Sequence, residues 1–300
     1  MMASNLATVI NTMRPPFLLL TPACVLVGIG SAATVTTIDW GLAALILLGA
    51  LCAHISVNML NEYHDYKSGL DSNTQRTPFS GGSGALPANP LALNAVLIGG
   101  IATLGITLLL GLYFIALRGW ALAPLGLLGT VIIVTYTQWL NRLPFMCLIA
   151  PGLGFGVLMV MGTHLVLAGN YSPFALLVSL VPFFLVNNLL LLNQYPDLDA
   201  DRAAGRRHFP IVYGLPKAHW IYALFNLAAY GTLIGCIVLQ ILPVWSALAL
   251  LTAPLAVRAT LGAFRFDGRD IDALKPALAM NVLVNLLTPT LLGVSLLMAY

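Results

Sequence analysis

Two short segments of this chain hold six of its ten acidic residues. The segments are N-E-Y-H-D-Y-K-S-G-L-D at 61–71 and N-Q-Y-P-D-L-D-A-D at 193–201. Both begin Asn-Glu/Gln-Tyr-x-Asp, so each places an asparagine four residues before an aspartate. On a helix this spacing puts the two side chains on one face. The chain therefore carries one arrangement of oxygen ligands twice.

Carboxylate and amide oxygens at this spacing suit Mg²⁺, which takes few protein ligands and completes its shell with phosphate oxygens. Two such clusters facing each other would hold Mg²⁺ and leave coordination positions open for a diphosphate. Mg²⁺ is accordingly the one cofactor we expect. The predicted metal ligands are Asn61, Asp65, Asn193, Asp197 and Asp201.

Basic residues near the clusters indicate how a diphosphate would be neutralised. Arginine matches the geometry of phosphate oxygens, and cations around a leaving group stabilise the charge that develops on it. The predicted diphosphate-binding residues are Lys67, Arg76, Arg142 and Arg206. The segment S-G-G-S-G at 80–84 could also cradle phosphate through its N–H groups. It lacks the lysine and the strand of a P-loop, so a flexible loop is the favoured interpretation.

The segments that position these clusters are apolar and long. The chain is 59% hydrophobic and 8% charged, with a mean hydropathy of +0.93. A bilayer is crossed by roughly 20 apolar residues, and spans of this length must be helices because lipid cannot satisfy an exposed backbone. We predict an all-α, polytopic membrane protein whose nine transmembrane helices surround a central cavity open to the cytoplasmic side. The predicted spans are 17–37, 40–60, 91–117, 120–136, 146–168, 174–192, 220–241, 244–264 and 277–298.

Charge distribution gives the expected orientation. In a nine-span arrangement, twelve of the thirteen Lys and Arg residues fall on one side, and Arg118 alone falls on the other. The positive-inside rule then places the N-terminus and both clusters in the cytoplasm and the C-terminus outside, in the inner (cytoplasmic) membrane. No positive n-region precedes residue 12, so we expect the first helix to be retained.

The expected organisation is one domain over residues 1–300. Because the two clusters end the second and sixth spans, spans 1–4 and 5–8 form a quasi-repeat, followed by a ninth span. The four cysteines have no C-x-x-C spacing, which argues against a disulfide framework or a thiolate metal site. The sequence shows no nucleic-acid-binding pattern and indicates no required protein partner.

The quoted residues resemble the two aspartate-rich signatures of the UbiA superfamily of intramembrane prenyltransferases. The combination of N-x-Y-x-D-Y-K-x-G-x-D with D-x-D-x-D-R-A-A-G-R-R is more similar to the branch that prenylates 1,4-dihydroxy-2-naphthoate than to the 4-hydroxybenzoate or chlorophyll branches. The resemblance includes Arg14-Pro15 at the first helix and Tyr136-Thr137 at the end of the fourth. Glu62 departs from it, since the family usually has aspartate there.

The resemblance implies Mg²⁺-dependent transfer of a polyprenyl group from an isoprenoid diphosphate to an aromatic carbon, most simply that of 1,4-dihydroxy-2-naphthoate or a similar quinone precursor. Polyprenyl diphosphate, an aromatic acceptor and the lipid bilayer are the expected partners. Tyrosine rings, among them Tyr63 and Tyr195, would stabilise an allylic cation, and His64 or His54 would remove the acceptor's proton. The implied catalytic residues are Asp65, Asp71, Asp197, Asp201, Tyr136 and His64.

Two alternatives remain open at this stage. A terpene cyclase of the same superfamily would ionise the same diphosphate without an aromatic acceptor. A cation transporter would use the polar line of His54, Asn58, Asn61 and Asp65, but it needs a polar path across the whole membrane, and the outer halves of the spans offer little of one.

Overall fold

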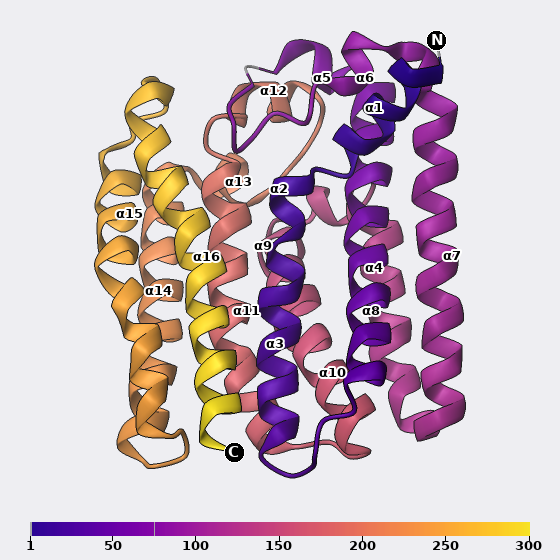
Figure 1. The fold of residues 1–300 in the computed structure, drawn as a ribbon. Helices are drawn as coiled ribbons and strands as arrows, with labels where there is room; N and C mark the ends of the chain where they lie inside the picture. Colours follow the sequence, from indigo (N-terminus) through magenta and orange to yellow (C-terminus); the bar gives the residue numbers. More distant parts are fainter. Residues whose placement is uncertain (1, 75) are drawn as a thin grey trace.

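The computed structural model describes residues 2–74 and 76–300, and all regular secondary structure in these residues is helical (Figure 1). The all-α prediction is therefore confirmed. In chain order the helices are α1 (Met2–Thr12), α2 (Pro15–Leu18), α3 (Leu20–Ala33), α4 (Trp40–Lys67), α5 (Leu70–Asn73), α6 (Ala85–Ala88), η1 (Pro90–Ala92), α7 (Leu93–Arg118), η2 (Trp120–Leu122), α8 (Ala123–Thr135), η3 (Leu140–Arg142), α9 (Pro144–Gly152), η4 (Leu153–Leu158), α10 (Met159–Ala168), α11 (Pro173–Asn193), α12 (Leu198–Ala203), α13 (Phe209–Tyr213), α14 (Leu215–Val238), η5 (Val244–Thr252), α15 (Ala253–Arg265) and α16 (Ile271–Ala299).

Among residues 2–74 and 76–300, seven helical segments are long and apolar enough to cross a membrane. The first predicted span is instead a pair, Asn5–Leu18 and Leu20–Ala33, bent by 43°, and the fourth is a shorter apolar helix, Trp120–Thr135. Every predicted span thus contains a helix, but nine crossings stay a prediction. The two termini lie at opposite ends of the bundle (Figure 1).

Proline explains the bend in the first span. Pro22 has no N–H to donate to the carbonyl of Leu18, and its ring crowds that carbonyl, so the helix breaks between α2 and α3. Arg14, just before α2, is left-handed at φ 55°. This conformation is unusual for a residue with a side chain, and Pro15 fixes the start of α2 directly after it. The bend places Arg14 beside the end of α4.

A second proline shapes the α9–α10 span. Pro151 lies inside α9, and the residues after it, Leu153–Leu158, form a π-helical segment, as expected where a hydrogen bond of the ladder is lost. The N–H of the next residue, Gly152, donates to Asn187 Oδ1 at 2.6 Å. Gly152 and Gly156 are one turn apart, and both press against the backbone of Phe183 on α11. This is the small-residue contact that lets membrane helices approach closely.

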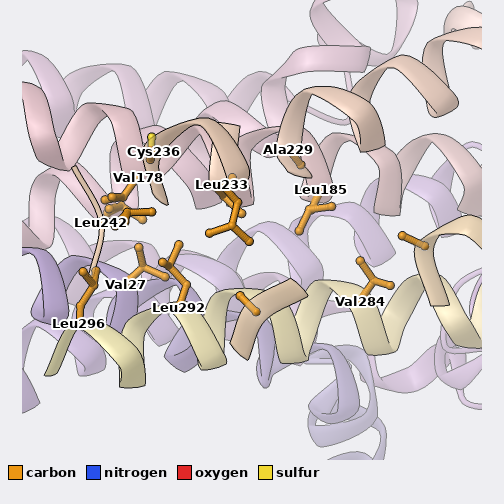
Figure 2. Close-up of a cluster of buried hydrophobic side chains, with 14 residues drawn as sticks. Val27, Val178, Leu185, Ala229, Leu233, Cys236, Leu242, Val284, Leu292 and Leu296 are labelled. Atoms are coloured by element: carbon orange, nitrogen blue, oxygen red, sulfur yellow. The ribbon is translucent and has the colours of Figure 1, made fainter. Parts of the chain in front are cut away.

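A continuous apolar core joins α3, α11, α14 and α16. Figure 2 shows Val27, Leu185, Leu233 and Leu292 pointing toward one another within a cluster of fourteen buried side chains. A buried polar chain crosses the same helices, where Tyr222 donates to Asn281 Oδ1 at 3.0 Å. Interhelical hydrogen bonds of this kind hold helices in register inside lipid.

Candidate active site

A cavity of about 1120 Å³ runs along the inner face of α4. Both Ile46 and Asp65 line it, so it follows about 28 Å of helix at the usual rise per residue. Its far part is apolar, with Leu112, Leu122 and Leu158 in its wall. Its other end is lined by both acidic clusters. An apolar channel with one polar end fits an elongated amphipathic molecule.

The two clusters meet at this polar end. The cavity is lined there by Asn61, Asp65, Asp71, Asn193, Asp197 and Asp201. Arg206 joins them directly, because its guanidinium forms an ion pair with Asp65 from the first cluster and with Asp201 from the second, the latter at 2.9 Å. The other oxygen of Asp201 lies 2.8 Å from His208 Nε2. The expected convergence of residues 132 positions apart is therefore found.

The electrostatics of the polar end reflect crowded carboxylates in a buried place. Burial, and to a lesser extent the neighbouring Asp201, raises the pKa of Asp197 to about 7. Burial, with smaller contributions from Glu62 and Asp65, likewise raises the pKa of Asp71 to about 7. Burial alone would lower the pKa of Arg206, but Asp65 and Asp201 more than reverse this and the pKa is raised. A bound cation would stabilise the ionised form of these carboxylates.

Three oxygens of the clusters are buried and have no hydrogen-bond partner in the described part of the chain. They are Asp71 Oδ2, Asn193 Oδ1 and Asp197 Oδ1. Buried polar atoms without partners are rare and call for an explanation, and oxygen donors of this kind fit Mg²⁺. Across residues 2–74 and 76–300, no three His, Cys, Asp or Glu side chains form a metal-binding group. Amide and phosphate oxygens would therefore have to complete the shell.

Glu62, the departure from the family pattern, is fully buried and has both oxygens occupied. Oε1 accepts from Arg14 Nε at 2.7 Å and from the Ser83 N–H at 2.8 Å, and Oε2 accepts from Ser83 Oγ at 2.7 Å. The longer side chain reaches two partners at once. Glu62 therefore ties α4 to Arg14 and to the glycine-rich loop. The sequence interpretation assigned Arg14 no function, although an arginine three residues before the first predicted span, 17–37, was a usable signal.

The loop 80–84 is attached to both clusters. Besides the Ser83 contacts with Glu62, the Gly81 N–H donates to Asp197 Oδ2 at 3.0 Å. Gly81, Gly82 and Gly84 all have positive φ, which glycine adopts without strain. A Cβ at Gly82 would come within 2.9 Å of Asp71 Oδ1. The flexibility of this loop stays a prediction, but its hydrogen bonds and the lining positions of Ser80, Gly81 and Gly82 place it at the acidic end of the cavity.

Of the remaining predicted catalytic residues, some line the cavity and others do not. Tyr136 and His54 line the cavity, and His54 Nδ1 lies 2.9 Å from Thr21 Oγ1. His64 is not among the lining residues, and its Nε2 lies 2.9 Å from Gln138 Nε2. Tyr63 and Tyr195 also lie outside the cavity wall.

The basic residues differ in the same way. Arg206 lies in the site, while Lys67, Arg76 and Arg142 are exposed. Arg76 donates to the backbone carbonyl of Asp71 at 2.7 Å, and Lys67 Nζ lies 5.4 Å from the centre of the Tyr63 ring. None of these three lines the cavity as the side chains now lie. Their role in binding diphosphate stays a prediction.

Fold and site together define a helical membrane protein with an oxygen-rich site at one end of an apolar cavity. Residues 21–287 match the model of the UbiA prenyltransferase family. The chain belongs to that family and is a prenyltransferase. The resemblance seen in the aspartate-rich motifs is thus confirmed.

The similarity to curated proteins is consistent with this family assignment. The chain is 28% identical over 252 residues to the 1,4-dihydroxy-2-naphthoate octaprenyltransferase of Bacillus subtilis, covering 83% of this chain and 79% of that protein. It is 28% identical over 294 residues to the enzyme of the same name from Escherichia coli, covering 93% and 91%.

Solved structures share the fold. A UbiA homologue from Aeropyrum pernix has a TM-score of 0.68 at 17% identity, covering 94% of this chain and 98% of that chain. A homologue from Archaeoglobus fulgidus, with a TM-score of 0.59 at 16% identity, covers 96% and 99% and was solved bound to DMAPP and Mg²⁺.

Proposed function

We propose that this protein transfers a polyprenyl group from its diphosphate to an aromatic carbon of 1,4-dihydroxy-2-naphthoate or a closely similar quinone precursor. The observation that carries this is the convergence of both acidic clusters at one end of a long apolar cavity. A diphosphate requires the polar end, and an isoprenoid tail requires the apolar remainder. The acceptor is supported by the names of the curated relatives and by the motif resemblance.

The metal-binding residues in this proposal are those with oxygens left free. Asp197 would use Oδ1, because its Oδ2 already accepts from the Gly81 N–H. Asn193 and Asp71 supply the other free oxygens. Asn61 and Asp65, the other ligands expected from sequence, line the same end, but Asn61 Oδ1 accepts from Arg14 at 3.2 Å and Asp65 Oδ1 pairs with Arg206. When bound, Mg²⁺ would neutralise the diphosphate and favour its departure. The structures of the Archaeoglobus homologue with Mg²⁺ and prenyl diphosphates support this choice of metal.

The chain's own groups then have separate tasks. The Gly81 N–H orients the Asp197 carboxylate so that Oδ1 faces the site, as hydrogen bonds behind a metal ligand generally do. Arg206 holds Asp65 and Asp201 together and adds positive charge beside the leaving group. Asp201 is held by Arg206 and His208 through both oxygens, so we assign it mainly to positioning Arg206, in addition to the metal role expected from sequence.

The apolar part of the cavity protects the reaction. As the bond between the prenyl carbon and the diphosphate oxygen breaks, an allylic cation forms that water would trap. Leu112, Leu122 and Leu158 help to exclude water while they hold the tail. The ring of Tyr136 lies in the same wall and can stabilise the cation through its face. The aromatic carbon then attacks, and its proton leaves; the assignment of this proton to His64 or His54 stays a prediction.

The test is prenyl transfer by the purified protein in detergent or nanodiscs. Labelled polyprenyl diphosphate is combined with dihydroxynaphthoate, 4-hydroxybenzoate, homogentisate or no acceptor, each with Mg²⁺ and with EDTA. We expect product with dihydroxynaphthoate and Mg²⁺, and none with EDTA. A cyclised hydrocarbon formed without acceptor would instead identify a terpene cyclase.

Variants make the test specific to the site. Asp197→Ala should lose more than the roughly 10–100-fold that follows from changing a group behind a metal ligand. Asp199→Ala is the matched control, because the Asp199 side chain two residues later is 96% exposed and pairs only with Arg202. Equal activity of the two variants would contradict the proposed ligand.

A further inference from the structure

One charged residue lies deep in a membrane-length helix without a partner. The seven membrane-length segments contain Glu62, Asp65, Lys67, Arg118, Lys217, Arg258, Arg265, Asp272 and Lys275. Arg258 lies seven residues from the nearer end of its segment, Val244–Arg265, farther in than any of the others. For its side chain, no hydrogen bond or ion pair is found within residues 2–74 and 76–300.

Of the other charged groups in these segments, all except Arg265, the last residue of its segment, have a local partner. Arg118 donates to the carbonyls of Val166 and Leu167 at 2.6 and 3.1 Å. Glu62 and Asp65 are paired as described above, and Asp272 pairs with Lys275 at 2.5 Å. Lys67 and Lys217 each lie near a tyrosine ring. Arg258 and Arg265 are therefore the two charges of these segments that have no partner within residues 2–74 and 76–300, and Arg258 lies farther from the end of the segment.

Arg258 faces outward, away from the cavity. It is exposed, and so are three nearby apolar side chains, with Leu251 of η5 at 70% and Val257 and Leu261 of α15 at 58% and 51%. α15 packs against α14 and α16 and lies at the edge of the bundle (Figure 1). In a membrane this stripe contacts lipid tails, where an unpaired guanidinium is strongly disfavoured.

The level of the lipid headgroups is marked by an aromatic pair near the same end of α15. Trp220 is 69% exposed, and its ring packs edge-on against Phe264 with centres 5.2 Å apart. Exposed tryptophan is typical of the membrane boundary. Arg258 lies six residues before Phe264, roughly 9 Å below that level.

Arg258 cannot easily reach this boundary alone. Side chains on a helix lean toward its N-terminus, which for α15 is the end away from Phe264 and Arg265. A lipid phosphate that pairs with Arg258 would therefore have to lie below the headgroup level. Arg265 is exposed on the same stripe, two turns further along, and its side chain leans back toward Arg258.

Within residues 2–74 and 76–300, no carboxylate forms an ion pair with Arg258 or Arg265. Asp267 accepts from the backbone N–H of Arg269, and Asp270 caps α16 through the N–H of Ala273. We infer that Arg258, with Arg265, forms a site on the outer face of α15 for the phosphate of an anionic phospholipid drawn in below the headgroup level. Arginine suits this ligand because its planar fork binds phosphate oxygens in pairs.

The site would be tested on the full-length protein by native mass spectrometry after reconstitution with phosphatidylglycerol, with phosphatidylcholine or with inorganic phosphate alone. The wild-type protein should retain phosphatidylglycerol in preference to phosphatidylcholine, and inorganic phosphate should not displace it. Arg258→Gln should reduce retention roughly tenfold, which corresponds to losing one charge-assisted hydrogen bond. Arg258→Lys should restore part of it.

Arg269→Gln is the matched control, since Arg269 is an exposed arginine in the loop between α15 and α16. It should retain lipid like the wild type. Because Arg258 is exposed, we expect both variants to fold, and their unfolding temperatures in lipid-free detergent should match. Equal lipid retention by Arg258→Gln, equal retention of phosphatidylcholine, or displacement by inorganic phosphate would each overturn the site. A dimer that Arg258→Gln alone dissociates would also overturn it, because a second copy of the chain would then be the partner.

Discussion

The carboxylates of this protein divide into those that hold the site together and those left free to bind a ligand. Glu62 and Asp201 have both oxygens occupied by protein groups. Asp71 and Asp197 each keep one buried oxygen without a partner in the described chain. Residue type alone does not separate the two groups, because all four are acidic residues in the same motifs.

Glu62→Ala should therefore act on stability. Removing the carboxylate leaves Arg14 without its ion pair, and breaking a buried pair typically costs about 3–5 kcal/mol. We expect a lower unfolding temperature in detergent, with the affinity for Mg²⁺ retained in the folded fraction. Asp199→Ala should leave the unfolding temperature unchanged, because that side chain is solvated. A loss of Mg²⁺ affinity at unchanged stability would show that Glu62 is itself a ligand.

Arg206→Met should also destabilise the protein. Without the guanidinium, Asp65 and Asp201 face each other with no bridging cation, again a change of about 3–5 kcal/mol for a buried pair. Added Mg²⁺ should recover part of this loss, since a divalent cation can take the place between the carboxylates. Thermal unfolding with EDTA and with Mg²⁺ measures both effects. Arg207→Met is the control, because the neighbouring side chain is exposed; similar losses in both variants would contradict the bridging role.

At the scale of elements, the glycine-rich loop connects the two clusters. Gly82→Ala places a methyl group 2.9 Å from Asp71 Oδ1 at a φ of +72°, so the loop must move off the site. Gly69→Ala imposes a similar φ of +76° with no atom within 4 Å of the added carbon. We expect Gly82→Ala to lower prenyl transfer and to increase proteolysis of the loop, while Gly69→Ala has a small effect on both. Identical behaviour would mean that backbone strain alone matters.

A second prediction for the elements concerns the close packing of α11 against the π-helical segment. A Cβ at Gly156 would lie 2.4 Å from the Phe183 backbone nitrogen, whereas a Cβ at Gly154 would meet nothing within 4 Å. Gly156→Ala should force the helices apart and cost about 1–3 kcal/mol, as overpacking commonly does. Gly154→Ala is the control on the same segment. Unfolding temperatures that fall equally for both would show that helix propensity, rather than packing, is responsible.

At the scale of the whole molecule, the charge distribution predicts an N-terminus in the cytoplasm and a C-terminus outside. The termini lie at opposite ends of the bundle (Figure 1), as an odd number of crossings requires. Alkaline phosphatase fused after Tyr300 should be active and green fluorescent protein at the same position dark. The reverse pattern is expected for fusions within the 203–207 loop, and phosphatase activity there would contradict the proposed orientation.

Much of this protein could be predicted from sequence because lipid simplifies the problem. A long apolar segment has to be a helix, so the spans near 40–60 and 174–192 were correctly located. The first span shows the limit. It is bent between Leu18 and Leu20, and a proline near a helix end, such as Pro22, does not by itself reveal whether the helix will end, kink or continue there.

The sequence by itself determined the helical fold, the family and the two oxygen-rich clusters, since composition and short motifs are local properties of the chain. Only the tertiary structure decided which oxygens are free. Glu62 is occupied because Arg14 and Ser83, 48 and 21 residues away, fold back onto it, and Asp197 is oriented by Gly81 from the other half of the chain. A hydrogen bond between distant residues depends on where packed helices bring their ends, and no local pattern encodes that position.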